Sequence, residues 1–189
     1  MNENHLVALS SPEWAQMLET NLLPWLAGVA DLGDDVLEIG PGPGLTTDLL
    51  RQRTARLTAV EIDGSLATAL AERLRGTNVE VVHGDATATG LTADRFSAVT
   101  CFAMLHHVPS PEQQDQVFAE VHRVLRAGGS FVGTDAVETD AIRRFHDDDV
   151  YVPVDPHTLG ARLEAVGFTD VGIEITDHEY SEFRFHARK

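Results

Sequence analysis

The feature that most constrains the fold is an eleven-residue run in which an apolar strand passes through three alternate glycines into a helix. Its sequence is Val36-Leu37-Glu38-Ile39-Gly40-Pro41-Gly42-Pro43-Gly44-Leu45-Thr46. Glycine permits positive φ angles and lets a ligand approach the backbone closely. The two prolines have no amide N–H, so the loop is poor in donors for a phosphate group. The turn is predicted to hold a ligand other than a pyrophosphate, and a tight turn without a ligand is the alternative.

The rest of the chain repeats the strand-then-helix pattern. From Asp35 onward, short runs rich in Val and Ile alternate with helical patterns, which is typical of βαβ units and a parallel sheet. The predicted strands are 36–39, 57–62, 79–82, 96–102, 130–134, 171–176 and 180–187, the last of them antiparallel. The predicted helices are 46–52, 65–75, 111–125 and 156–166, after a leading helix that Ser11 caps and Pro12 begins. Such sheets bind ligands at the carboxyl ends of their strands.

Composition limits the number of domains and the classes of partner. The chain has 189 residues, 43% of them hydrophobic, which favours one domain over 1–189, with 1–31 as an N-terminal helical extension. Its 30 acidic and 14 basic residues give a net charge of −16, which disfavours nucleic acid and anionic membranes as partners. Cys101 is the single cysteine, so no intramolecular disulfide forms. No apolar run suits a membrane span or a signal peptide, and a cytoplasmic location is expected.

Acidic residues follow the next two predicted strands. Glu61 ends the second strand, 21 residues after Gly40, where a carboxylate can accept hydrogen bonds from a ribose diol. Asp63 is the rival carboxylate, but it precedes a helix and suits an N-cap. Asp85 follows the third strand in Gly84-Asp85-Ala86, where it can accept from an exocyclic amine. Together these strand ends predict a site for an adenosine-like ligand.

These residues resemble the class I S-adenosylmethionine-dependent methyltransferases over most of the chain, from about Asp35 onward. The resemblance rests on 38–44, on 60–63, on 84–86, and on two later stretches, Leu105-His106-His107-Val108 and 124–129. It departs from the family at Ala127, where proline is usual. The resemblance implies a Rossmann-like, doubly wound, three-layer α/β/α fold. Its seven strands have the order 3-2-1-4-5-7-6, and the last is antiparallel.

The resemblance also implies the cofactor, S-adenosylmethionine, and roles for individual residues. Glu38 and the Gly40 backbone hold the methionyl amine, and the Phe102 backbone approaches the same group. Ile62 packs on the adenine, Asp85 accepts from its amine, and the Ala86 N–H meets a ring nitrogen. The cofactor-binding residues predicted in this way are Glu38, Gly40, Pro41, Gly42, Gly44, Glu61, Ile62, Asp85, Ala86 and Phe102.

Methyl transfer from a sulfonium depends chiefly on alignment in a dry pocket, and a base is needed only if the acceptor loses a proton. His106 is preferred over His107 as that base, with packing or solvent exposure as the plainer alternative for either. The run His146-Asp147-Asp148-Asp149 suits a solvated face, because metal ligands normally come from separated positions. No metal is predicted.

The expected function is methyl transfer to O, N or C of a small molecule, because only short segments are left to form a lid over the acceptor. A catalytically silent cofactor-binding regulatory or partner subunit is the main alternative. A nicotinamide oxidoreductase is a third, which Asp85 and the glycine spacing disfavour, since a dinucleotide loop has the pattern G-x-G-x-x-G and here Leu45 takes the last position. The acceptor and the oligomeric state are not specified by any motif.

Overall fold

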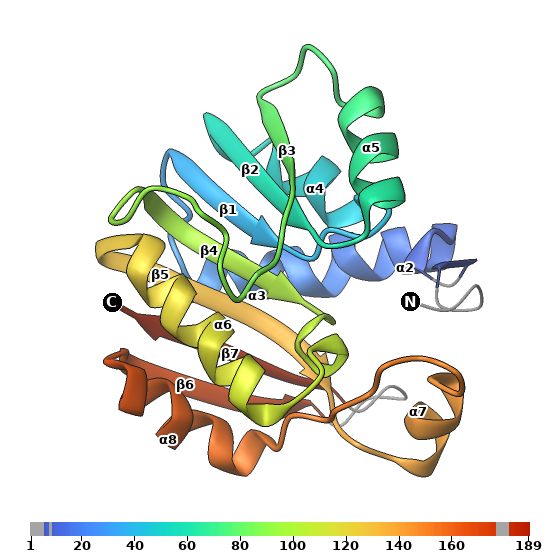
Figure 1. The fold of residues 1–189 in the computed structure, drawn as a ribbon, viewed down its shortest axis with the longest axis vertical. Coiled ribbons are helices and arrows are strands. Elements are labelled where there is room, and N and C mark those ends of the chain that lie inside the picture. Colours follow the sequence, from blue (N-terminus) through green and yellow to red (C-terminus); the bar gives the residue numbers. More distant parts are fainter. Residues whose placement is uncertain (1–5, 8, 177–181) are drawn as a thin grey trace.

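A computed structural model describes residues 6–7, 9–176 and 182–189, and its centre is one seven-stranded sheet (Figure 1). The strand order is β3-β2-β1-β4-β5-β7-β6, which confirms the predicted order. The strands are β1 (Asp35–Ile39), β2 (Arg56–Glu61), β3 (Val79–His83), β4 (Phe96–Phe102), β5 (Leu125–Ala136), β6 (Thr169–Thr176) and β7 (Glu182–Arg188).

The register of the parallel strands brings their carboxyl ends to one edge of the sheet. Ile39 at the end of β1 pairs with Val60 of β2 and with Cys101 of β4, and Glu61 of β2 pairs with His83 of β3. β7 runs antiparallel to both β5 and β6, as predicted. The segments that follow β1 to β4 therefore all begin at the same edge, where a ligand site is expected.

Helices precede the sheet and connect its strands. They are α2 (Pro12–Met17), the π-helical turn η1 (Leu18–Leu22), α3 (Leu23–Val29), α4 (Leu45–Leu50), α5 (Gly64–Arg73), the 3-10 turn η2 (Leu105–His107), α6 (Pro111–Val124), α7 (Asp140–Phe145) and α8 (Pro156–Val166). The Ser11 side chain accepts from the Trp14 N–H at 3.1 Å, and Pro12 occupies the first turn. The predicted leading helix and its cap are confirmed.

Side chains alternate between two cores because neighbouring residues of a strand point to opposite faces. Phe131 of β5 joins a large core with α6 and α8, whereas the next residue, Val132, joins a second core with α3 and α4. Val99 and Ala98 of β4 divide in the same way. The sheet is therefore covered on both faces, which is the predicted three-layer arrangement.

The structure differs from the predicted elements at the junction of α6 with β5 and at α7. Helix α6 ends at Val124 rather than Leu125, because Leu125 pairs with Phe96 and opens β5 ahead of a register shift. β5 therefore starts earlier than the predicted 130–134. Helix α7 was not predicted; it has no buried residue and so no apolar periodicity, although the Thr139 hydroxyl caps it.

The last predicted strand, 180–187, begins outside the described residues, and β7 covers the remainder.

Among the helices of the described ranges, none combines the length and the apolar character that crossing a membrane requires.

Candidate functional site

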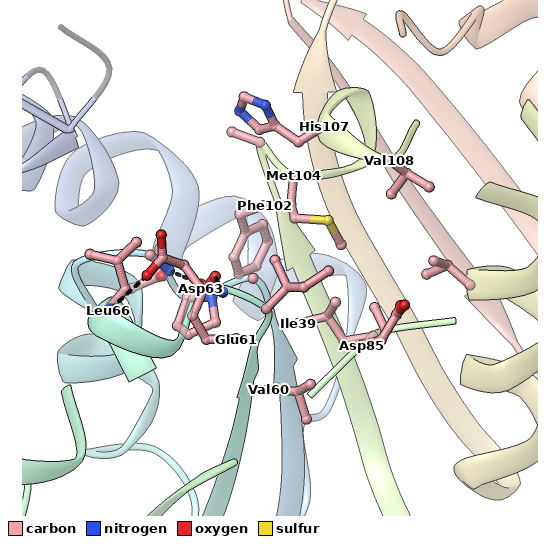
Figure 2. A pocket seen from close by; sticks show the side chains of 18 of the residues that line it. Ile39, Val60, Glu61, Asp63, Leu66, Asp85, Phe102, Met104, His107 and Val108 are labelled. Carbon is pink, nitrogen blue, oxygen red and sulfur yellow. Dashed lines mark hydrogen bonds between the residues drawn. The ribbon is translucent and has the colours of Figure 1, made fainter. Parts of the chain in front are cut away.

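A cavity of about 460 Å³ lies at the carboxyl ends of β1 to β4 (Figure 2). Its size falls within the ~300–1,000 Å³ usual for small-molecule sites. Most of the predicted site residues line it, namely Gly40, Pro41, Gly42, Glu61, Ile62, Asp85, Ala86 and Phe102. Leu9 and Trp14 from the N-terminal segment also line it. Glu38, Gly44 and His106 lie outside the lining.

The glycine loop needs glycine at its first and last positions. Gly40 has a φ of +66°, and a Cβ there would lie 2.3 Å from the Met104 Cγ. Gly44 has a φ of +88° and starts α4 as its N-cap, so it shapes the turn from behind the cavity wall. The loop can therefore lie against Met104 only while its first residue has no side chain.

Glu38 supports the loop from underneath. Its carboxylate is buried and accepts hydrogen bonds from the Thr46 hydroxyl and, at 2.6 Å, from the Thr47 hydroxyl. Burial raises the pKa of Glu38 to about 7, and the two threonine hydroxyls oppose that rise. The side chain thus ties β1 to the first turn of α4 and carries a charge that depends on pH near neutrality.

Glu61 is fixed by backbone donors on both sides. One carboxylate oxygen accepts from the Gly42 N–H and the other from the Asp63 N–H, each at 3.0 Å. A carboxylate has about four acceptor positions, so each oxygen retains capacity for a ligand hydroxyl. Glu61 lines the cavity in this held orientation, which fits the predicted contact to a ribose diol.

The assignment of Asp63 as a helix cap is confirmed. Its carboxylate accepts from the Ser65 N–H at 2.8 Å and the Leu66 N–H at 3.1 Å, at the start of α5. The hydrogen bond from the Ser65 side chain is the main cause that lowers the pKa of Asp63. The capping role leaves Glu61 as the better-placed acceptor for a ligand.

The ends of the second and third strands supply an apolar surface and an acceptor. Ile62 lines the cavity and is 68% exposed, so its side chain is free to pack on the face of a planar ring. The Oδ1 atom of Asp85 accepts both the N–H and the hydroxyl of Thr87 at 2.8 Å. Its Oδ2 atom can therefore accept from a ligand amine. This wall fits an adenine base.

His106 and His107 lie after β4, at a different side of the cavity from Glu61. His107 lines the cavity, whereas His106 is buried behind it, where Asp135 accepts from the His106 backbone N–H at 3.1 Å and also bonds the ring Nδ1. In the view of Figure 2 the His107 ring lies beyond Met104 and Phe102 from Glu61. Burial lowers the pKa of His107 to about 4, with His106 as the second cause.

Met104 and Asp135 were not singled out from the sequence, and His146 was considered only within the run 146–149. Met104 covers Gly40, and no motif marks it. Asp135 lies near the carboxyl end of β5, where the strand-end rule that found Glu61 would also have found it. His146 joins His106 and His107 only through the folding of segment 137–155, which no sequence pattern fixes.

A Rossmann-like sheet of this order, with a glycine loop and two strand-end carboxylates facing an adenosine-sized cavity, defines the class I S-adenosylmethionine-dependent methyltransferases. A protein-family model described as "Methyltransferase domain" matches residues 37–133, about half of the chain. The chain therefore belongs to this methyltransferase family.

Two curated relatives illustrate how acceptors vary among similar proteins. The chain is 46% identical over 72 residues to the ribosomal RNA small subunit methyltransferase A of Deinococcus radiodurans, covering 37% of this chain and 25% of that protein. It is 34% identical over 116 residues to the ubiquinone biosynthesis O-methyltransferase of Pseudomonas aeruginosa, covering 59% and 47%. The chain thus spans between a quarter and a half of the length of these relatives.

Solved structures share the fold. A SAM-dependent methyltransferase from Archaeoglobus fulgidus aligns with a TM-score of 0.75 at 20% identity, covering 95% of both chains. Phosphoethanolamine N-methyltransferase 2 of Haemonchus contortus, in complex with S-adenosyl-L-methionine, aligns with a TM-score of 0.73 at 15% identity, covering 90% of this chain and 52% of that one. At these identities the likeness shows the fold alone.

Proposed function

We propose that this protein transfers the methyl group of S-adenosylmethionine to an O, N or C atom of a small molecule. The observation that carries the proposal is the position of Glu61, which is held by two backbone donors and lines the cavity together with Ile62 and Asp85. When bound, the cofactor supplies an electrophilic methyl group on a sulfonium, and a neutral thioether is left after transfer.

The residues predicted for the cofactor keep their roles in this proposal. Glu61 accepts from the ribose hydroxyls, Asp85 accepts from the adenine amine, the Ala86 N–H donates to the ring, and Ile62 packs on its face. Glu38, beneath the glycine loop, attracts the methionyl ammonium group, and Gly40, Pro41, Gly42 and Gly44 shape the loop above it. The Phe102 backbone approaches the same methionyl ammonium group.

We assign binding of the methyl acceptor to the end of the cavity next to the η2 turn, which we call the acceptor end. His107 is the residue there that lines the cavity, and His106, predicted as the base, lies behind it. In this proposal His106 is a positioning residue: its contacts with Asp135 fix the turn that presents His107. Alignment of the acceptor with the methyl group supplies most of the rate enhancement.

A small acceptor is favoured over RNA by charge. The net charge of −16 repels a polyanion, and the ribosomal RNA methyltransferase match covers only about a third of the chain. The cytoplasmic location expected from the sequence suits a small metabolite.

The test is methyl transfer from tritium-labelled S-adenosylmethionine to a panel of phenols, carboxylates, amines and activated-carbon compounds, with total RNA as a separate arm. Label on a small compound, at a rate above that of a Glu61→Gln variant, is the expected result. Label on RNA alone would contradict the small-molecule assignment. Tight cofactor binding with no labelled product in any arm would favour the silent-subunit alternative.

A further inference from the structure

Three histidines from two distant segments meet beside the cavity. His106 and His107 belong to η2, and His146 follows α7. One ring nitrogen from each lies within 4.8 Å of those of the other two. The ring centroids are 4.2 Å apart for His106 and His107, 4.8 Å for His106 and His146, and 5.3 Å for His107 and His146. The fold thus places His146 beside His106 and His107, from which it is distant in the sequence.

Each of the three rings is held at Nδ1 by an oxygen atom. The partners are Asp135 for His106, the Val150 carbonyl at 3.1 Å for His107, and the Ile142 carbonyl at 2.7 Å for His146. The Val150 and Ile142 carbonyl oxygens only accept, and an ionised Asp135 carboxylate also only accepts, so these bonds assign the proton to Nδ1 and the lone pair to Nε2. All three Nε2 atoms are buried. Histidine ligands of metals are oriented in this same way by an outer oxygen.

We propose that His106, His107 and His146 bind one divalent transition-metal ion, of the zinc type, through their Nε2 atoms. Imidazole suits such borderline ions, and three histidines are a known set for zinc with a fourth position for another ligand. The sequence groups His146 with the neighbouring Asp147 to Asp149, whereas the fold places it beside His106 and His107.

The distances and charges around the cluster support the assignment. A tetrahedral ion with bonds of ~2.0–2.1 Å holds its nitrogens ~3.4 Å apart. Ring nitrogens of the three histidines already lie within 4.8 Å of one another, so metal binding requires a closure of about 1.4 Å at most between any two of them. Two carboxylates favour a cation: Asp135, bonded to His106, and Asp149, whose oxygen lies 3.9 Å from the His107 Nδ1. Arg143, near the Tyr151 ring, is paired with Glu138.

The ion would lie at the acceptor end of the cavity, because His107 lines that cavity. It would also connect η2 to the segment that carries α7, which otherwise has no buried residue in its helix. The proposal is independent of the methyl-transfer proposal, since metal binding is measured without cofactor or acceptor.

The experiment uses tag-free protein, stripped with a chelator and then dialysed against Zn²⁺ or Co²⁺. Expected are one bound ion per chain by elemental analysis, a Co²⁺ absorption spectrum typical of tetrahedral nitrogen ligation, and a higher melting temperature with Zn²⁺. His146→Ala should weaken binding at least about tenfold. His157→Ala is the matched control, because His157 is exposed in the first turn of α8 and should leave binding unchanged.

Wild-type protein that binds no stoichiometric Zn²⁺ or Co²⁺ would overturn the proposal. Equal affinity in His146→Ala and wild type would also overturn it. If His146→Ala fails to fold, the wild-type Co²⁺ spectrum decides alone: tetrahedral nitrogen ligation supports the site, and a spectrum of hydrated Co²⁺ contradicts it.

Discussion

The two ends of the cavity are built in different ways. At the cofactor end, Glu61, Gly42 and Asp85 lie on or directly after consecutive parallel strands, and their contacts are with residues close by in the chain or on the adjacent strand. At the histidine end, Asp135 comes from β5, His107 from η2 and His146 from beyond α7. The cofactor end is therefore specified by local motifs and strand register, whereas the histidine end is specified by tertiary folding.

The largest effect is expected from Gly40→Ala. The new Cβ would meet the Met104 side chain at 2.3 Å, and overpacking of this kind costs about 1–3 kcal/mol of stability. A loop that shifts to relieve this contact loses the geometry that holds the ligand, and a cost of that size carried into binding is a loss of up to about 150-fold in affinity. Gly90→Ala is the control, since Gly90 has a φ of +70° but no atom within 4 Å of an added Cβ. Titration with S-adenosylhomocysteine measures the ligand affinity of both variants. Equal binding by the two variants would show that the loop does not touch the ligand.

The second largest loss of ligand affinity is expected from Glu61→Gln. Losing the charge removes about 1.5–3 kcal/mol from hydrogen bonds to the ribose, equivalent to about 10- to 150-fold in affinity. Glu72→Gln, an exposed glutamate on α5, should bind like wild type. Melting curves check that Glu61→Gln remains folded. Wild-type affinity in this variant would contradict the contact between Glu61 and the ribose of the cofactor.

Glu38 should make cofactor affinity depend on pH. With its pKa raised to about 7, the carboxyl is mostly neutral at pH 6 and mostly ionised at pH 8, and only the ionised form attracts an ammonium group. Affinity for S-adenosylhomocysteine should therefore rise about tenfold from pH 6 to pH 8. Glu38→Gln should flatten this profile. A wild-type affinity that falls over the same range would contradict the role of Glu38.

Asp85 should have a smaller effect that is selective for the base. An uncharged replacement, Asp85→Asn, weakens acceptance from the adenine amine by about 1 kcal/mol, or about fivefold. The inosine analogue of S-adenosylhomocysteine lacks that amine, so its affinity should change less than that of the adenosine compound. If both ligands weaken equally in the variant, Asp85 does not contact the amine.

The smallest effect on cofactor binding is expected at the histidine end. His107→Ala removes a side chain that lines the cavity away from Glu61 and Asp85, so affinity for S-adenosylhomocysteine should stay within about twofold of wild type. Isothermal titration in metal-free buffer measures this. A tenfold loss would show that the two ends of the cavity are not separate.

Alternation, glycine turns and strand-end acids are local signals, so the sequence predicted the sheet and most of the residues that line the cavity at the ends of β1 to β3. The order of seven strands came from the family resemblance, and the structure has that order. The residues that reasoning missed depend on long-range packing: Met104 is placed by the turn after β4, and His146 by the path of 137–155. The early start of β5 at Leu125 depends on pairing with Phe96, which helical periodicity in α6 conceals.

The most direct test of the central claim is calorimetric titration of the purified protein with S-adenosylmethionine, S-adenosylhomocysteine and NAD in parallel. The account predicts one site per chain for the first two ligands, no binding of NAD, and weaker binding of both adenosyl ligands by Glu61→Gln. Binding of NAD in preference to S-adenosylmethionine, or adenosyl binding that Glu61→Gln leaves unchanged, would contradict it.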